Sequence, residues 1–227
     1  MRQAPCPAIQ APAQQACLAS REVERIAFLG RFSLVEAIRR LLSLSAQRAF
    51  ANLMRENGFY DDQLARISLP DALGGSKGAD VLTAVLTSAL FRNRLTKQVN
   101  RAAEKGAELA APVVADAVLN MGIPDAAAII RGGGSSATEL LRTAMGEKLL
   151  GTMLPGIDRG LRLFDNAVVV EALRAATNID FAGLRDDVTA KASDAVYRAI
   201  GREEIAIRAD PASTNDPLLI AVFGLAK

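Results

Sequence analysis

Residues 80–121, DVLTAVLTSALFRNRLTKQVNRAAEKGAELAAPVVADAVLNM, form the stretch that decides the fold. On a helical wheel of about 100° per residue, its apolar residues fall within about 120° of one another. This apolar stripe consists of Val81, Val85, Ala89, Leu95, Val99, Ala103, Ala110, Val114, Ala117 and Met121. The spacing predicts that the stretch is helical almost throughout and packs one face against a core.

Two residues of this stretch bear on its continuity. Arg92 falls in the middle of the apolar stripe. Either the run is two helices that break near Thr87 and Ser88, where a hydroxyl can cap a new start, or a buried guanidinium needs a partner. We favour the break. Pro112 is expected to bend or end the helix one turn earlier, since proline cannot donate the backbone hydrogen bond.

The remaining body shows the same helical spacing and the residues that begin and end helices. A capping box at 33–36 predicts a helix that ends at Asn57 and Gly58, and a second box at 136–139 predicts a helix through Leu150. Further helices are predicted over 181–209, where Pro211 follows, and over 217–223. A brief helix and an extended connector are expected in 58–70, followed by a flexible glycine-rich segment at 73–79. A short helix with Pro124 in its first turn is expected to end at 132–134. Later helices are expected to be interrupted at 155–156 and 165–166, and 168–176 is expected to be helix rather than strand.

These patterns predict the fold class and the domain organisation. No alternating strand pattern and no internal repeat is found in the sequence. The prediction is therefore an all-α, single-domain multi-helix bundle with long amphipathic helices and no significant β-sheet. Residues 1–32, with three prolines and four glutamines, are predicted to be a loosely ordered leader, and residues 33–227 the helical domain.

Composition excludes several classes of protein. The chain has 227 residues, of which 50% are hydrophobic and 23% charged, as in ordinary soluble globular proteins. It contains no histidine, which excludes Ser-His-Asp and Cys-His nucleophiles and every histidine-ligated metal site. We therefore predict no metal, no cofactor and no catalytic residue of those kinds.

The charge balance and the apolar runs bear on partners. The 27 Lys plus Arg residues against 25 Asp plus Glu give a net charge of +2, without the basic surplus of a nucleic-acid binder. No apolar run is long enough for a secretory signal or a transmembrane segment. Cys6 and Cys17 both lie in the leader, where they are either incidental or a lipid anchor or redox pair. We predict neither a nucleic-acid partner nor a transmembrane segment.

Two groups of residues could bind an anion. The glycine-rich run 131–136 precedes a predicted helix, so it is either a phosphate cradle or a turn between two helices. It lacks the Gly-Lys-Ser/Thr ending and the preceding strand of a phosphate loop, which favours the turn. Arg94, Lys97, Arg101 and Lys105 share a helix face opposite the apolar stripe, which favours a solvated face.

Glu203 is the most unusual charged residue of the predicted 181–209 helix. On the wheel it falls among the apolar residues Val188, Ala192, Ala195, Val196, Ala199 and Ile207. If that stripe faces the core, burial would raise the pKa of Glu203 or require Arg92, Arg101 or Arg208 as a partner. The alternatives are a structural ion pair, or a stripe that ends before Glu203. Glu204 and Arg208, four residues apart, most simply form a surface pair.

Four ordered motifs carry a family resemblance. They are GFYDD at 58–62 with RISLP at 66–70, NRAAE at 100–104 with Pro112, REEIAIR at 202–208 with Pro211, and NDPLL at 215–219. In this order and spacing they resemble the bacterial domain-of-unknown-function family 4197, from about Ser33 to Gly224.

The resemblance implies an all-helical domain, in proteins commonly exported to the bacterial cell envelope, and carries no established activity. Members of that family usually begin with a signal or lipoprotein leader, whereas residues 1–32 have neither pattern. The hypothesis is that the native start differs or that the leader has been lost, and the mass of the native N-terminus would test it.

Two functions follow as expectations. The first is a non-enzymatic binding or assembly module of the cell envelope, which takes an apolar small molecule or a protein partner on its apolar helix faces, or forms a homo-oligomer. The alternative is a hydrolase or lyase of an anionic small molecule, with Glu203 as acid or base and Arg101 or Arg208 orienting the anion. A pocket that joins Glu203 to Arg101 and Glu104 would favour the enzymatic function. A sealed ion pair at Glu203 would favour a structural role. The candidate ligand-binding or ion-pair residues are Tyr60, Arg66, Asn100, Arg101, Glu104, Glu203, Glu204 and Arg208.

Overall fold

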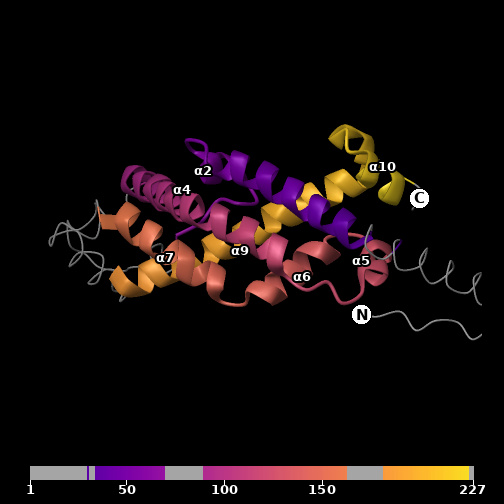
Figure 1. Cartoon of the computed structure of the whole chain (residues 1–227). Helices are drawn as coiled ribbons and strands as arrows, with labels where there is room; N and C mark the ends of the chain where they lie inside the picture. The colour runs from indigo at the N-terminus through magenta and orange to yellow at the C-terminus, as the bar shows by residue number, and fades with distance from the viewer. Residues whose placement is uncertain (1–29, 31–33, 70–88, 163–180, 225–227) are drawn as a thin grey trace, which may run out of the picture.

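The structure is a computed structural model that describes residues 30, 34–69, 89–162 and 181–224 (Figure 1). Helices make up nearly all of the regular structure in these ranges, and none of the described residues is in a strand. The elements are a helix over 34–53, α2 (Gly58–Asp61), α4 (Ala89–Asn120), α5 (Ala126–Gly132), α6 (Ser136–Met145), α7 (Lys148–Leu161), α9 (Phe181–Ala209), the 3-10 helix η3 (Pro211–Thr214) and α10 (Pro217–Phe223). The all-α prediction is confirmed.

The two C-terminal helices have the predicted bounds because local residues fix their ends. α10 begins at Pro217, and the Asp216 carboxylate accepts hydrogen bonds from the backbone N–H groups of Leu218 and Leu219. α9 ends at Ala209, two residues before Pro211. Between them lies η3, which the sequence did not predict.

The central helix α4 is more continuous than predicted. Pro112 lies inside it, and the helix runs on to Asn120. Arg92 is exposed, so the alternative prediction of a buried guanidinium at this position is wrong. Thr87 and Ser88, where the break was expected, lie outside the described residues, as do the leader 1–29, Ser33 of the first capping box, 73–79, 165–166 and 168–176.

Four other predictions about where helices begin or end differ from the structure. The first helix ends at residue 53 rather than 57, and a turn leads through Asn57, whose φ of 62° is left-handed, into α2. The helix predicted through Leu150 ends at Met145, because Gly146 adopts a φ of 52° and α7 starts afresh at Lys148. Pro155 and Gly156 lie within α7 rather than ending it. Pro124 precedes the N-cap of α5, Asp125, instead of lying in its first turn.

α4 and α7 pack closely against each other, and small residues make the approach possible. A Cβ on Gly156 would lie 2.5 Å from the carbonyl oxygen of Lys105, and one on Gly160 would lie 2.6 Å from the Cα of Ala102. From the α4 side, a Cβ on Gly106 would lie 2.8 Å from Ile157. The two helices therefore approach closely where one of them carries a glycine.

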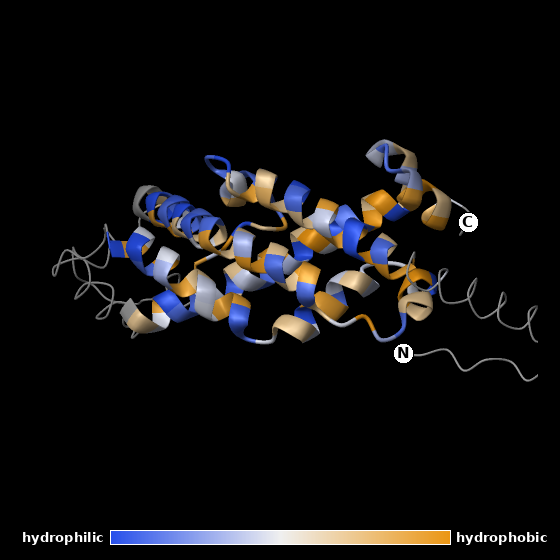
Figure 2. Ribbon diagram, viewed as in Figure 1, coloured by the Kyte–Doolittle hydropathy of each residue, from blue (hydrophilic) through white to orange (hydrophobic). Residues whose placement is uncertain are grey.

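The core is one cluster of mostly aliphatic side chains to which every long helix contributes. α9 runs along the middle of the molecule in Figure 1, where it contacts α4, α6 and α7. In Figure 2 each of these helices carries hydrophobic and hydrophilic residues in alternating patches, as amphipathic helices do. The fully buried residues of α4 include Leu95, Val99, Ala102, Ala103, Ala107, Ala110, Val114 and Val118. Those of α9 include Ala192, Ala195, Val196, Ile200 and Ile207.

Candidate functional site

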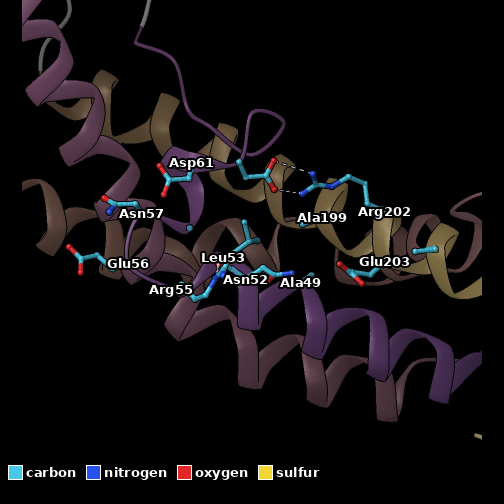
Figure 3. Close-up of a pocket in the computed structure, with 13 residues that line it drawn as sticks. Ala49, Asn52, Leu53, Arg55, Glu56, Asn57, Asp61, Ala199, Arg202 and Glu203 are labelled. Carbon is cyan, nitrogen blue, oxygen red and sulfur yellow. Dashed lines mark hydrogen bonds and ion pairs between the residues drawn. The ribbon is translucent and has the colours of Figure 1, made fainter. Parts of the chain in front are cut away.

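Two pockets adjoin the turn between the first helix and α2. The first, here called the Asp62 pocket, has a volume of about 600 Å³ and lies between that turn and α9 (Figure 3). The second, here called the Glu104 pocket, has a volume of about 790 Å³ and lies between the turn, α4 and α7. Glu56 lines both. In each pocket six of the lining residues are charged: Arg55, Glu56, Asp61, Asp62, Arg202 and Glu203 in the first, and Glu56, Arg101, Glu104, Lys105, Glu108 and Arg159 in the second.

Asp62 and Arg202 form the central ion pair of the Asp62 pocket. The Nη1 of Arg202 donates to Oδ1 of Asp62 at 3.1 Å, and its Nη2 donates to Oδ2, as the dashed lines in Figure 3 mark. Asp62 also accepts from the backbone N–H groups of Leu64 and Ala65, at 2.9 and 3.2 Å. The hydrogen bond from Arg202, together with these amides, lowers the pKa of Asp62. The pair ties the connector after α2 to α9.

Glu203 lines the same pocket and is half-buried, while Glu204 is the fully buried carboxylate. The helical wheel therefore pointed to the wrong one of two adjacent residues, since Glu204 and not Glu203 is buried. Glu204 lies four and eight residues after the fully buried Ile200 and Val196, on the side where α9 meets α6. The spacing of Val196, Ile200 and Glu204 is a signal in the sequence for this burial, but Ala195, Ala199 and Glu203 have the same apolar spacing.

The Glu204 carboxylate caps the N-terminus of α6. Its Oε1 accepts from the backbone N–H of Ala137 at 3.1 Å, and its Oε2 accepts from the N–H and the hydroxyl of Thr138 at 2.7 and 2.6 Å. A carboxylate at this position satisfies free helix amides and interacts favourably with the helix dipole. The cap comes from α9, so the sequence of α6 contains no sign of it.

Arg208 completes this network from the next turn of α9. Its Nε donates to Oε1 of Glu204 at 2.9 Å, and its Nη groups donate to the carbonyls of Ile129 and Ile130 at the end of α5 and to the hydroxyl of Ser136. The predicted Glu204–Arg208 pair therefore exists, but the surface location is wrong, since the two side chains are 0% and 10% exposed.

The glycine-rich run 131–136 is a turn between two helices, as favoured from the sequence. Gly133 and Gly134 adopt positive φ angles of 63° and 53° between α5 and α6. The predicted capping box is wrong, because Ser135 is the N-cap without a side-chain hydrogen bond and the Ser136 hydroxyl donates to the Ile129 carbonyl. Glu204 occupies the α6 amides that a phosphate would need.

Asn100 holds the connector after α2 against α4. It is fully buried, its Oδ1 accepts from the N–H of Ile67 at 2.8 Å, and its Nδ2 donates to the Ile67 carbonyl at 3.0 Å. The amide thus pairs with both backbone groups of one residue, as a neighbouring strand would.

Replacing Asn100 by alanine should destabilise the fold by about 1–3 kcal/mol, because the buried N–H and C=O of Ile67 lose their partners. Urea unfolding followed by circular dichroism measures this change. Asn93→Ala is the matched control, since Asn93 is exposed on the same helix. Equal effects of the two substitutions would contradict the anchoring role.

Tyr60 in α2 and Arg66 in the connector after it contact each other at the surface. The guanidinium of Arg66 lies 4.2 Å from the centroid of the Tyr60 ring, and its Nε donates to the Tyr60 carbonyl. This is a cation–π contact that closes the loop. Neither residue lines the two pockets.

The basic face of α4 is exposed, as favoured from the sequence. Arg94, Lys97, Arg101 and Lys105 all face solvent. Nη2 of Arg101 lies 3.0 Å from Oε1 of Glu56, and Nζ of Lys105 lies 2.6 Å from Oε1 of Glu108. Exposed pairs of this kind contribute little to stability.

Glu104 is the buried carboxyl of the second pocket. The residue is 7% exposed and lies close to the backbone N–H of Asn57. Its Oε1 is closed off from solvent and has no partner among the described residues. Burial raises the pKa of Glu104, against the lowering effect of Arg101.

Glu104→Gln should stabilise the protein at neutral pH more than at pH 4. A carboxyl whose pKa is raised by folding destabilises the fold once it is ionised, so the wild type loses stability as the pH rises from about 4.5 through the raised value. Thermal unfolding at a series of pH values measures the difference between the two proteins. Glu108→Gln, at an exposed position on the same helix, should show no such trend.

The structure separates the residues that the enzyme alternative joins. Glu203 lines the Asp62 pocket, whereas Arg101 and Glu104 line the Glu104 pocket. Arg208 and Glu204 are bound in the network below α6 and line neither. Sequence reasoning missed Asp62, Arg202 and Arg159, which only the tertiary fold places at the pockets.

Two further properties of the described residues concern metal binding and membrane insertion. Within the described ranges, no group of three or more His, Cys, Asp or Glu residues is arranged to hold a metal ion. No described helix is both long and apolar enough to cross a bilayer.

Comparison with known proteins identifies the family but no characterised relative. No curated protein and no solved structure matches this chain. The family model described as Protein of unknown function (DUF4197) matches residues 29–224, which is nearly the whole chain and all of the helices above. This range agrees with the motifs at 58–70, 100–112, 202–211 and 215–219. The chain therefore belongs to the DUF4197 family of proteins of unknown function.

Proposed function

We propose that the protein is a non-enzymatic binding module of the cell envelope and that its ligand enters the pockets beside the 54–57 turn. The observation that carries the proposal is that two pockets, of about 600 and 790 Å³, adjoin at this turn and share Glu56. Pockets of this size suit small molecules. The envelope location rests on the family resemblance alone.

The lining of the pockets favours a polar ligand. Six of the thirteen described residues that line the Asp62 pocket are charged, and so are six of the eleven that line the Glu104 pocket. The alanine-rich faces of α4 and α9 are buried in the core. An apolar ligand, a protein partner and a homo-oligomer stay predictions. The pockets favour a small polar molecule over an apolar ligand.

A second candidate function has one observation in its favour. Glu104 combines a raised pKa with a position beside Arg101, which suits a general acid in a hydrolase or lyase. In that case the acid is Glu104 rather than Glu203. Turnover of a chromogenic phosphate or carboxylate ester by the wild type, abolished in Glu104→Gln, would support it.

Native mass spectrometry tests the binding module. The chain is purified from its own host, and its native and denatured masses are compared. We expect a small molecule that is retained in the native state and released on denaturation. A bare chain mass, or a bare integer multiple of it, would contradict a small-molecule ligand and point to self-assembly or protein partners.

Pocket-filling variants with matched controls locate the ligand. Leu109→Trp narrows the Glu104 pocket, and Leu119→Trp places the same side chain at an exposed position of α4 outside both pockets. Ala206→Trp and Ala209→Trp form the same pair for the Asp62 pocket on α9. One pocket-filling variant should lose the retained mass while both controls keep it. Retention by all four variants would place the ligand elsewhere.

A further inference from the structure

We propose that the Glu104 pocket binds a small zwitterion, with a primary ammonium group at Glu104 and an anionic group, carboxylate or phosphate, at Arg159. The inference rests on the proposed binding function and names the chemistry of its ligand. It follows from the charges of the pocket that remain without partners, from two buried acceptor atoms, and from the shape of the pocket wall.

Four of the six charged residues that line the pocket form ion pairs with one another, and Glu104 and Arg159 do not. Its cations are Arg101, Lys105 and Arg159, and its carboxylates are Glu56, Glu104 and Glu108. Arg101 pairs with Glu56, and Lys105 pairs with Glu108. Arg159 has no ion-pair partner in the described part of the chain and donates only to the carbonyl of Pro155. One carboxylate and one guanidinium therefore remain, and a ligand that carries both signs of charge complements them.

A buried acceptor of this pocket, Oε1 of Glu104, calls for a hydrogen-bond donor, and so does Oδ1 of Asn57, which lines the neighbouring Asp62 pocket. Oε1 of Glu104 and Oδ1 of Asn57 are both closed off from solvent, and neither has a partner among the described residues. The two residues are close to each other, because the backbone N–H of Asn57 acts to lower the pKa of Glu104. Buried acceptors without donors are rare in native proteins and are costly. An ammonium group has three donors and also neutralises the carboxylate.

The wall of the pocket determines how a ligand would fit beside Glu104. Gly156 and Gly160 line the α7 side, where their backbone packs against α4. Met54 lines the opposite side and is 36% exposed. Its unbranched side chain can change rotamer, so this part of the wall can adapt to a ligand. Arg159 is exposed and is positioned to meet the anionic end of the ligand.

Isothermal titration calorimetry of the full chain with phosphoethanolamine, glycine and phosphocholine tests the proposal. Phosphocholine is the matched control, because its quaternary nitrogen keeps the positive charge but has no N–H donor. We expect saturable binding of phosphoethanolamine or glycine that is at least about tenfold tighter than binding of phosphocholine. The tighter of the two names the anion, phosphate or carboxylate. No binding of either, or equal binding of phosphocholine, would overturn the inference.

Variants assign the binding to this pocket. Glu104→Gln and Arg159→Gln should each weaken binding about tenfold or more. Asp116→Asn, at an exposed position of α4 outside both pockets, should leave binding unchanged. Arg159 is exposed, so its replacement tests the site even if the Glu104 variant folds poorly. Unchanged binding in Arg159→Gln or in a folded Glu104→Gln would refute the assignment.

The failure of this inference is distinguishable from failure of the proposed function. A retained host molecule without an ammonium group, lost in Leu109→Trp, would refute the zwitterion and leave the binding module intact. The absence of any retained molecule, together with no binding in the titrations, would refute both.

Discussion

Glu204→Ala should lower the free energy of unfolding by about 3–5 kcal/mol, the largest effect expected of any single replacement of a charged residue in the described structure. The substitution removes the partner of the Arg208 guanidinium, which is 10% exposed, and so leaves a buried charge unpaired. It also removes the acceptor of two backbone N–H groups at the start of α6, those of Ala137 and Thr138. Urea unfolding followed by circular dichroism measures the change.

The adjacent residue gives the matched control for this prediction. Glu203→Ala removes the same side chain one position earlier, where it is half-buried and lines a pocket, and should change stability by less than about 1 kcal/mol. A larger loss in Glu203→Ala than in Glu204→Ala would show that the carboxylate facing α6 has been misassigned.

Gly156→Ala should destabilise the protein by about 3 kcal/mol, at the upper end of the cost of overpacking. The added Cβ would lie 2.5 Å from the carbonyl oxygen of Lys105, and a backbone atom cannot turn aside as a side chain can. α7 would have to move away from α4 along their closest contact. Thermal unfolding of the variant should show a clear fall in the midpoint.

The same substitution five residues earlier should have the opposite sign. Gly151 lies on the exposed side of α7, and a Cβ there meets nothing within 4 Å. Gly151→Ala should therefore stabilise the helix by up to about 1 kcal/mol, since alanine has the higher helix propensity. Loss of stability in both variants would mean that α7 does not tolerate alanine for a reason other than its contact with α4.

The helices that the sequence predicts best are those whose ends are determined by adjacent residues. α10 has Asp216 and Pro217 at its start, and α9 is followed by Pro211, so both ranges agree with prediction. Pro112 and Pro155 misled the prediction because each lies within a longer helix, where packing outweighs the lost hydrogen bond.

The candidate site was harder to predict than the fold. Consecutive helical residues differ by about 100° in direction, so a wheel separates Glu203 from Glu204 only when the neighbouring helix is known. The pockets themselves combine residues 49–62, 98–109, 156–160 and 199–206, which are far apart in the chain. Asn100 and Glu104 lie on one helix, four residues apart, yet one anchors a connector and the other lines a pocket. Only the tertiary contacts of each side chain distinguish these roles.

The cap of α6 also bears on the order of folding. Glu204 lies 66 residues beyond Thr138, so α6 acquires its N-terminal cap only once α9 has docked, and an interaction across such a separation is expected to form late. Loss of the cap should therefore act on the unfolding rate far more than on the folding rate. Glu204 would then determine how long the native protein persists, with little influence on how quickly it forms.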